Sequence, residues 1–170
     1  MMDTRSLLGM WDMQRQRHGI GLRVVALIPD AQLNAHPIQG MRSPAELVTH
    51  TYTMMRELPQ GVLRGQIQDY GEGHVTVAST AALLRYCEEA FAAGDKATRL
   101  VTDAQLKADV KTPWGRPFPG WMVYGILHDE YLHHRGQLYA YVRQMGAAPP
   151  MLWDFAGNAP QYRPQAQPTA

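Results

Sequence analysis

The sequence predicts an all-α protein in which four long helices form a bundle. Apolar residues recur every three or four positions in four segments, capping signals flank these segments, and few stretches alternate in the manner of strands. A chain of 170 residues is long enough for one such domain. We expect the domain to occupy residues 1–155. Residues 156–170, which are rich in Pro, Gln and Ala, are expected to form a flexible tail.

The starts of the first two helices carry recognisable signals. Residues 4–28 present one apolar stripe, and Pro29 ends that helix. The second helix begins after Ser43, whose hydroxyl can cap it. Pro44 fits the first helical position, and Glu46 stands where a capping box needs a carboxylate.

Proline and glycine predict the remaining boundaries. The second helix is expected to close at Pro59, and the third to run over residues 80–93 and stop at Gly94. The fourth is predicted over residues 120–145. Residues 59–78 contain several glycines and are assigned to a loop that shapes the mouth of a pocket.

Composition excludes several classes of function. Sixteen Lys and Arg nearly balance fifteen Asp and Glu, so we expect no nucleic-acid partner, which normally requires a concentrated basic surface. No apolar run approaches the roughly 18 residues of a membrane span, so no membrane partner is expected. Residues 1–5 lack the basic start of a signal peptide, which favours a cytoplasmic location. The single cysteine, Cys87, excludes an internal disulfide and lies on an apolar helical stripe, as core residues do.

A cluster of histidines in the last helix is the main chemical signal. Glu130 and His134 are four residues apart and therefore share one face of the helix, which its apolar residues turn toward the bundle interior. His50 lies on the apolar stripe of the second helix and can supply a third group from another helix. Two imidazoles and one carboxylate leave open coordination positions, as in catalytic zinc or iron sites. The alternatives are a structural ion pair between Glu130 and His134 and a hydrogen-bonded core histidine at position 50.

Three segments resemble a known family. Residues 133–143 (HHRGQLYAYVR), which a Gly and a Pro-Pro pair follow, resemble the C-terminal signature of the DinB/YfiT-like metalloprotein superfamily. Residues 43–50 (SPAELVTH) are similar to that family's first metal-binding helix, and residues 112–115 (TPWG) to the loop before its last helix. The resemblance covers residues 4–154.

This resemblance implies a four-helix bundle of up-down-down-up type, often a homodimer, with a divalent metal held by three histidines. The first metal ligand matches His50 and the last matches His134. The middle ligand of the family is usually a histidine, and here that position is Glu130. Either Glu130 ligates through oxygen, or the site has degenerated. With Glu130 as ligand, zinc, nickel, iron or manganese fits the donor set.

The activities of relatives imply a reaction. Relatives include transferases and isomerases that use low-molecular-weight thiols such as bacillithiol, mycothiol or glutathione. We therefore expect a thiol S-transferase or related detoxification enzyme, which joins a thiol cosubstrate to a small electrophile. Arg135 and Gln137 are expected to orient the last helix. The alternatives are a metal-dependent hydrolase on the same site, or a non-catalytic dimer whose metal site is degenerate.

Overall fold

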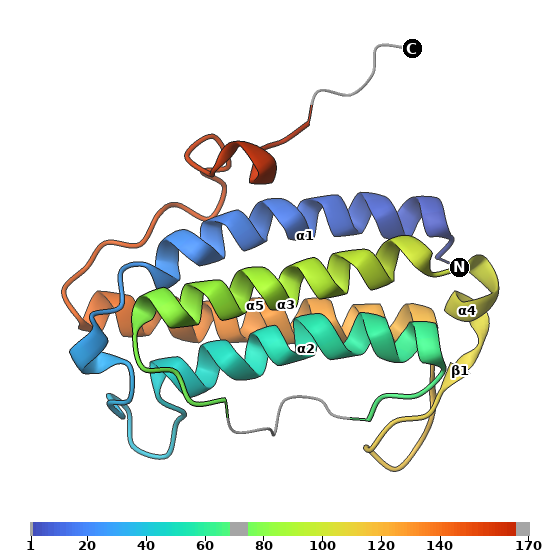
Figure 1. Ribbon diagram of the computed structural model, residues 1–170, viewed down its shortest axis with the longest axis horizontal. Helices are drawn as coiled ribbons and strands as arrows, with labels where there is room; N and C mark the ends of the chain where they lie inside the picture. The colour runs from blue at the N-terminus through green and yellow to red at the C-terminus, as the bar shows by residue number, and fades with distance from the viewer. Residues whose placement is uncertain (1, 69–74, 166–170) are drawn as a thin grey trace.

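The computed structural model describes residues 2–68 and 75–165. Four long helices pack side by side as a bundle, which confirms the predicted fold class (Figure 1). They are α1 (Thr4–Val25), α2 (Pro44–Arg64), α3 (Thr80–Leu100) and α5 (Gly120–Gln144). The shorter elements are η1 (Asp30–Gln32), α4 (Asp103–Lys107), β1 (Asp109–Val110), β2 (Phe118–Pro119) and η2 (Pro160–Tyr162). The two strands pair antiparallel in the connection that leads into α5.

The helices follow the up-down-down-up order. The colour gradient in Figure 1 shows that α1 and α5 run in one direction and that α2 and α3 run in the other. Hydrogen bonds between α1 and α3 agree with these directions. Trp11 in α1 donates a hydrogen bond to Asp95 near the end of α3, and the Ile28 carbonyl just after α1 accepts one from Thr80 at the start of α3. Helices α1 and α3 are therefore antiparallel.

Two helices continue past residues that the sequence pattern marks as breakers. The predictions that the second helix closes at Pro59 and that the third stops at Gly94 are both wrong, because α2 reaches Arg64 and α3 reaches Leu100. Pro59 has no N–H for the carbonyl of Met55, which is its usual intrahelical partner. Gly94 packs directly on that carbonyl: a Cβ at position 94 would lie 2.2 Å from the Met55 oxygen. The two residues therefore form one close contact between α2 and α3.

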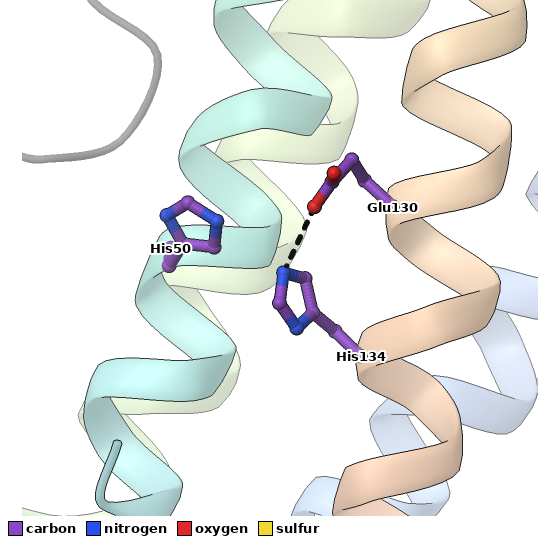
Figure 2. A group of neighbouring side chains, drawn as sticks. All are labelled: His50, Glu130 and His134. Atoms are coloured by element: carbon purple, nitrogen blue, oxygen red, sulfur yellow. Dashed lines mark ion pairs between the residues drawn. The ribbon is translucent and has the colours of Figure 1, made fainter. Parts of the chain in front are cut away.

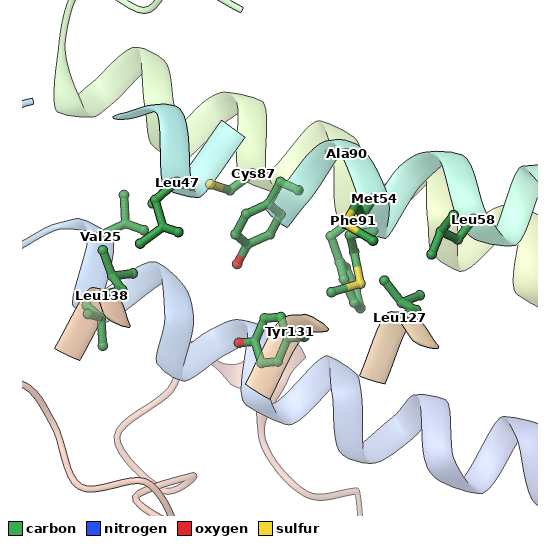
Figure 3. Close-up of a cluster of buried hydrophobic side chains, with 14 of the residues drawn as sticks. Val25, Leu47, Met54, Leu58, Cys87, Ala90, Phe91, Leu127, Tyr131 and Leu138 are labelled. Atoms are coloured by element: carbon green, nitrogen blue, oxygen red, sulfur yellow. The ribbon is translucent and has the colours of Figure 1, made fainter. Parts of the chain in front are cut away.

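The core fills the space between the four long helices. Figure 3 shows side chains from all four meeting along the bundle axis, among them Leu58 from α2, Phe91 from α3 and Leu127 from α5. Cys87 is fully buried in this cluster, which confirms its prediction as a core residue. Burial raises the pKa of its thiol well above the ordinary value, so Cys87 stays protonated and unreactive.

The segment after α5 returns across the bundle to cover α1 (Figure 1). Arg15 in α1 donates to the carbonyl of Arg163 at 2.8 Å, and Arg23 pairs with the Asp154 carboxylate at 2.6 Å. Asn158 is 1% exposed and donates to the carbonyl of Gln16. The C-terminal segment is thus held by hydrogen bonds to α1.

The sequence pattern predicted a flexible tail over residues 156–170. The described part of that stretch, residues 156–165, packs on α1, while residues 166–170 lie outside the described residues. The backbone carbonyls of Asp154, Gln161 and Arg163 accept hydrogen bonds from arginines of α1, and composition carries no signal for backbone acceptors. Residues 69–74 of the predicted loop also lie outside the described residues.

His18 lies in the core between α1, α2 and α3. Its side chain has no exposed surface, its Nδ1 is 2.9 Å from the Tyr52 hydroxyl, and its ring stacks on Phe91 with centroids 4.2 Å apart. Tyr162 from the C-terminal segment covers it edge-on. Burial lowers the pKa of His18 from 6.5 to about 3, because the charged form loses its hydration.

This buried imidazole predicts a pH dependence of stability. The folded-state pKa lies below the unfolded value, so the unfolded chain binds the proton first as the pH falls. The contribution of neutral His18 is complete above pH 6.5 and decreases by about 1.4 kcal/mol per pH unit toward pH 3. Between pH 7 and pH 5 we expect this residue to remove about 2 kcal/mol from the free energy of unfolding. Urea denaturation of the wild type and of His18→Gln at both pH values measures it. Identical pH dependence in the two proteins would contradict the assignment.

Candidate metal centre

Three side chains from two helices converge at one side of the bundle. His50 projects from α2, and Glu130 and His134 project from α5, one helical turn apart (Figure 2). Each offers one ligand atom, and these atoms all lie within 4.8 Å of one another. The rings of His50 and His134 are nearly perpendicular, with centroids 4.9 Å apart. The structure therefore brings together the three residues that the sequence singles out.

A neighbour on the same helix determines which ring nitrogen of neutral His134 carries the proton. Its Nδ1 lies 2.9 Å from Oε1 of Gln137, an amide oxygen that can only accept a hydrogen bond. Nδ1 therefore carries the proton in the neutral ring, and Nε2 presents its lone pair to the cluster. The Gln137 amide nitrogen contacts His133 at 3.1 Å, which holds the amide in this orientation.

Within the described residues, the Nε2 atom of His134 lacks a hydrogen-bond partner. It is buried and makes no hydrogen bond to any residue that the structure describes, although Oε2 of Glu130 lies 3.1 Å away. A buried polar atom without a hydrogen bond is costly. An imidazole lone pair that faces a carboxylate oxygen at this distance forms a donor set that a cation would satisfy. The residues present thus fit a divalent metal with nitrogen and oxygen ligands.

A pocket opens beside the cluster. Its volume is about 280 Å³, and His50 and Glu130 line it together with Met54, Trp114 and Ile126. Glu130 is 40% exposed, whereas His134 lies behind it at 6%. The donor set is therefore accessible from one side, and apolar side chains form the described walls of that access.

A short loop before α5 places the Trp114 indole at this pocket. The Thr112 hydroxyl accepts a hydrogen bond from the Trp114 amide at 3.2 Å and donates to the Arg116 carbonyl at 2.6 Å. The indole packs edge-on against Phe118, with centroids 5.9 Å apart. These contacts hold the loop in place, so the Trp114 side chain forms a fixed part of the pocket wall.

The family of the chain follows from comparison with known sequences. The model of the DinB family matches residues 2–161, almost the whole described chain. The chain belongs to the DinB family. No curated protein matches this DinB sequence.

Crystal structures of two DinB-like proteins share the fold. One, from Bacillus subtilis, is 19% identical with a TM-score of 0.68, and the match covers 81% of this chain and 92% of that one. The other, from Bacillus cereus ATCC 10987, is 19% identical with a TM-score of 0.70, and the match covers 86% and 95%. At this identity the comparison shows the fold of this DinB protein.

Several features of the site were not predicted as such. The contact of Gln137 with His134 follows from their i, i+3 spacing, although the sequence suggested only a general role for Gln137 in orienting the helix. The pocket walls Met54 and Ile126 lie on different helices. The sequence placed Met54 on the apolar stripe of the second helix as a packing residue and did not single out Ile126. Among the described residues of this DinB protein, no helix has the length and hydropathy needed to cross a membrane.

Replacement of Gln137 by Leu is expected to weaken zinc binding by roughly 10- to 100-fold, the usual effect of losing a hydrogen bond that orients a ligating imidazole. Competition with a chromogenic chelator measures the affinity. Gln137→Glu keeps an acceptor for the Nδ1–H of His134 and is expected to retain most of the affinity. Gln144→Leu, on the same helix but distant from His134, is the matched control. Equal affinities for Gln137→Leu and Gln144→Leu would show that Gln137 does not orient the imidazole.

Proposed function

We propose that this DinB protein is a metal-dependent thiol S-transferase, or a related detoxification enzyme, that acts on a small apolar electrophile. The observation that carries the proposal is the convergence of His50, Glu130 and His134 at the base of a pocket with apolar walls. Family membership supports a metal at this position, in line with the thiol-dependent activities that the resemblance implies.

The proposed roles follow from the position of each side chain. His50, Glu130 and His134 would hold one zinc, nickel, iron or manganese ion, and Gln137 would orient the last imidazole. A divalent metal at this site would stabilise a low-molecular-weight thiol as its thiolate at neutral pH. Met54, Trp114 and Ile126 offer the electrophile an apolar surface beside the donor set.

The pocket lining favours thiol transfer over hydrolysis. A hydrolase needs a group that takes a proton from the attacking water. Besides His50 and Glu130, which are both proposed ligands, the described residues that line the pocket include no such group. A thiol is far more acidic than water and needs less help to lose its proton.

Metal analysis and a thiol panel test the proposal. Protein purified without a His-tag is expected to contain close to one divalent transition-metal ion per chain. The panel joins glutathione, bacillithiol or mycothiol to 1-chloro-2,4-dinitrobenzene, and we expect turnover that requires both metal and thiol. Hydrolysis of a chromogenic ester without thiol would replace the proposal with the hydrolase. Protein without bound metal would support the degenerate site.

The proposal includes a cellular location and an oligomeric state for the enzyme. Low-molecular-weight thiols are kept reduced in the cytoplasm, which is where we propose the protein acts. We also propose a homodimer, as the family resemblance implies. Light scattering of the purified protein measures its mass, and a monomer of 19.1 kDa would contradict the dimer.

A further inference from the structure

A second pocket lies between α5 and the chain segment that follows it. Its volume is about 540 Å³, compared with about 280 Å³ for the pocket beside the metal donor set. One wall is the face of α5 between Leu132 and Arg143, and the other is the segment 149–152. Pockets of roughly 300 to 1,000 Å³ accommodate small organic ligands. This pocket, which we call the C-terminal pocket, is therefore large enough for one.

The two walls of the C-terminal pocket are tied to each other. Gly146, whose φ is +84°, turns the chain at the end of α5. Pro149 and Pro150 then restrict the backbone of the returning segment. The Tyr139 hydroxyl donates to the Pro150 carbonyl at 3.0 Å. This hydrogen bond anchors the segment to α5, so the pocket is preformed.

Gly136 leaves a recess in the α5 wall. It lines the pocket, and a Cβ at this position would meet no atom of the described residues within 4 Å. Leu132 and Tyr139 occupy the neighbouring turns of the same helix face and also line the pocket. The recess therefore lies between an aliphatic side chain and an aromatic ring.

Two guanidinium groups line the C-terminal pocket. Arg135 and Arg143 are eight residues apart on α5, with Tyr139 midway between them. The Arg143 guanidinium lies 5.6 Å from the centre of the Tyr139 ring and donates to the Tyr139 carbonyl at 3.4 Å, so this side chain turns back toward Arg135.

These two cations have no acidic partner. Neither Arg135 nor Arg143 forms an ion pair within residues 2–68 and 75–165. The described residues that line the pocket include no Asp or Glu. Two positive charges without a negative one make the pocket complementary to an anion.

The outer wall of the pocket is apolar and exposed. Met151 is 75% exposed and Leu152 is 39% exposed, and both line the pocket. Adjacent apolar side chains that remain in contact with water often mark a site for a ligand. The C-terminal pocket thus combines apolar surface with two cations.

We propose that the C-terminal pocket binds a small amphipathic organic anion, a carboxylate or phosphate monoester that carries an apolar chain or ring. Arg135 and Arg143 bind the anionic group through charge-assisted hydrogen bonds, which guanidinium groups form with both kinds of anion. The apolar part of the ligand lies in the recess at Gly136 and against Met151 and Leu152.

This site is separate from the metal centre. Arg135 follows His134 in the sequence, but successive residues of a helix point about 100° apart. No described residue lines both the C-terminal pocket and the pocket beside the metal donor set. Binding of the organic anion is therefore expected to be the same in metal-loaded and metal-free protein.

Isothermal titration with four compounds tests the proposal. Octanoate and octyl phosphate carry both an anionic group and an apolar chain, acetate lacks the chain, and 1-octanol lacks the charge. We expect saturable binding of one octanoate or octyl phosphate per chain, and affinities for acetate and 1-octanol that are weaker by roughly tenfold or more. Binding of octanoate alone identifies a carboxylate site, and binding of octyl phosphate alone identifies a phosphate site. Absence of binding by both anions, equal affinity for 1-octanol, or binding that requires the metal would overturn the proposal.

Substitutions on α5 locate the bound anion. Arg135→Gln and Arg143→Gln are each expected to lower the affinity roughly tenfold or more, the loss expected for a hydrogen bond to a charged group. Gly136→Leu fills the recess and is expected to abolish binding, yet to melt no lower than the wild type, because its Cβ meets no described atom and Leu favours a helix. Unchanged affinity in Gly136→Leu would overturn the proposal.

Gly125→Leu is the matched control. A Cβ at position 125 also meets no atom of the described residues within 4 Å, and Gly125 does not line the C-terminal pocket. We expect this variant to bind octanoate or octyl phosphate as the wild type does. Light scattering of both glycine variants distinguishes a ligand site from an interface between two copies of the chain. A dimer that Gly136→Leu alone converts to a monomer, without anion binding in the wild type, would overturn the proposal.

Discussion

His134→Ala is expected to empty the metal centre. Its Nε2 is buried, has no hydrogen-bond partner within the described structure and lies 3.1 Å from the Glu130 carboxylate, so its removal leaves two ligands from two helices. We expect the metal content to fall from about one ion per chain to near zero after dialysis, and the thiol-dependent activity to fall with it. Inductively coupled plasma mass spectrometry measures the content.

His133→Ala is the control for this experiment. His133 is the adjacent histidine in the sequence and is exposed. It contacts the Gln137 amide and lies edge-on to the His134 ring, but it is not one of the three residues whose ligand atoms converge. We expect this variant to keep its metal. If His134→Ala retained a full complement of metal, His134 would not be a ligand, and the functional proposal would lose its basis. Circular dichroism of both variants verifies that the helices are intact.

Gly94→Ala is expected to destabilise the bundle by roughly 3 kcal/mol or more, at the upper end of the cost of overpacking. The new methyl group would lie 2.2 Å from the Met55 carbonyl oxygen, and this backbone atom cannot move without displacing α2 from α3. Urea denaturation measures the free energy of unfolding.

Gly125→Ala is the matched control, because a Cβ at position 125 in α5 meets no atom of the described residues within 4 Å. That variant is expected to be stabilised by about 0.5 to 1 kcal/mol through helix propensity alone. A loss of stability of similar size in both variants would show that the contact of Gly94 with Met55 is not the cause.

Local signals predicted the parts of the fold that depend on a few neighbouring residues. The capping box of Ser43 and Glu46 forms as expected, because both of its hydrogen bonds lie within one helical turn. Glu130 and His134 share a face because their spacing alone places them together.

Features of the fold that depend on two distant segments could not be predicted from local sequence signals. Pro59 and Gly94 each indicate a helix end when read alone, and only the packing of α2 on α3 shows that both lie inside helices. The proximity of His50 to Glu130 and His134 likewise depends on the antiparallel packing of α2 and α5. The sequence predicted this proximity through the family resemblance. The hydrogen bond from Tyr131 in α5 to the Arg17 carbonyl in α1 depends on the register of these two helices, for which no short-range pattern exists.

The packing of the C-terminal segment on α1 also constrains the order in which parts of the protein can fold on the ribosome. Helix α1 is synthesised before the other helices of the bundle, but its partners Asp154 and Asn158 follow Arg23 by more than 130 residues. Until those residues emerge, the outer surface of α1 and the imidazole of His18 lack their final cover. Contacts between such distant positions form late and slow folding. A nascent chain stalled before residue 154 is therefore expected to show protease sensitivity in α1 that the released protein does not show.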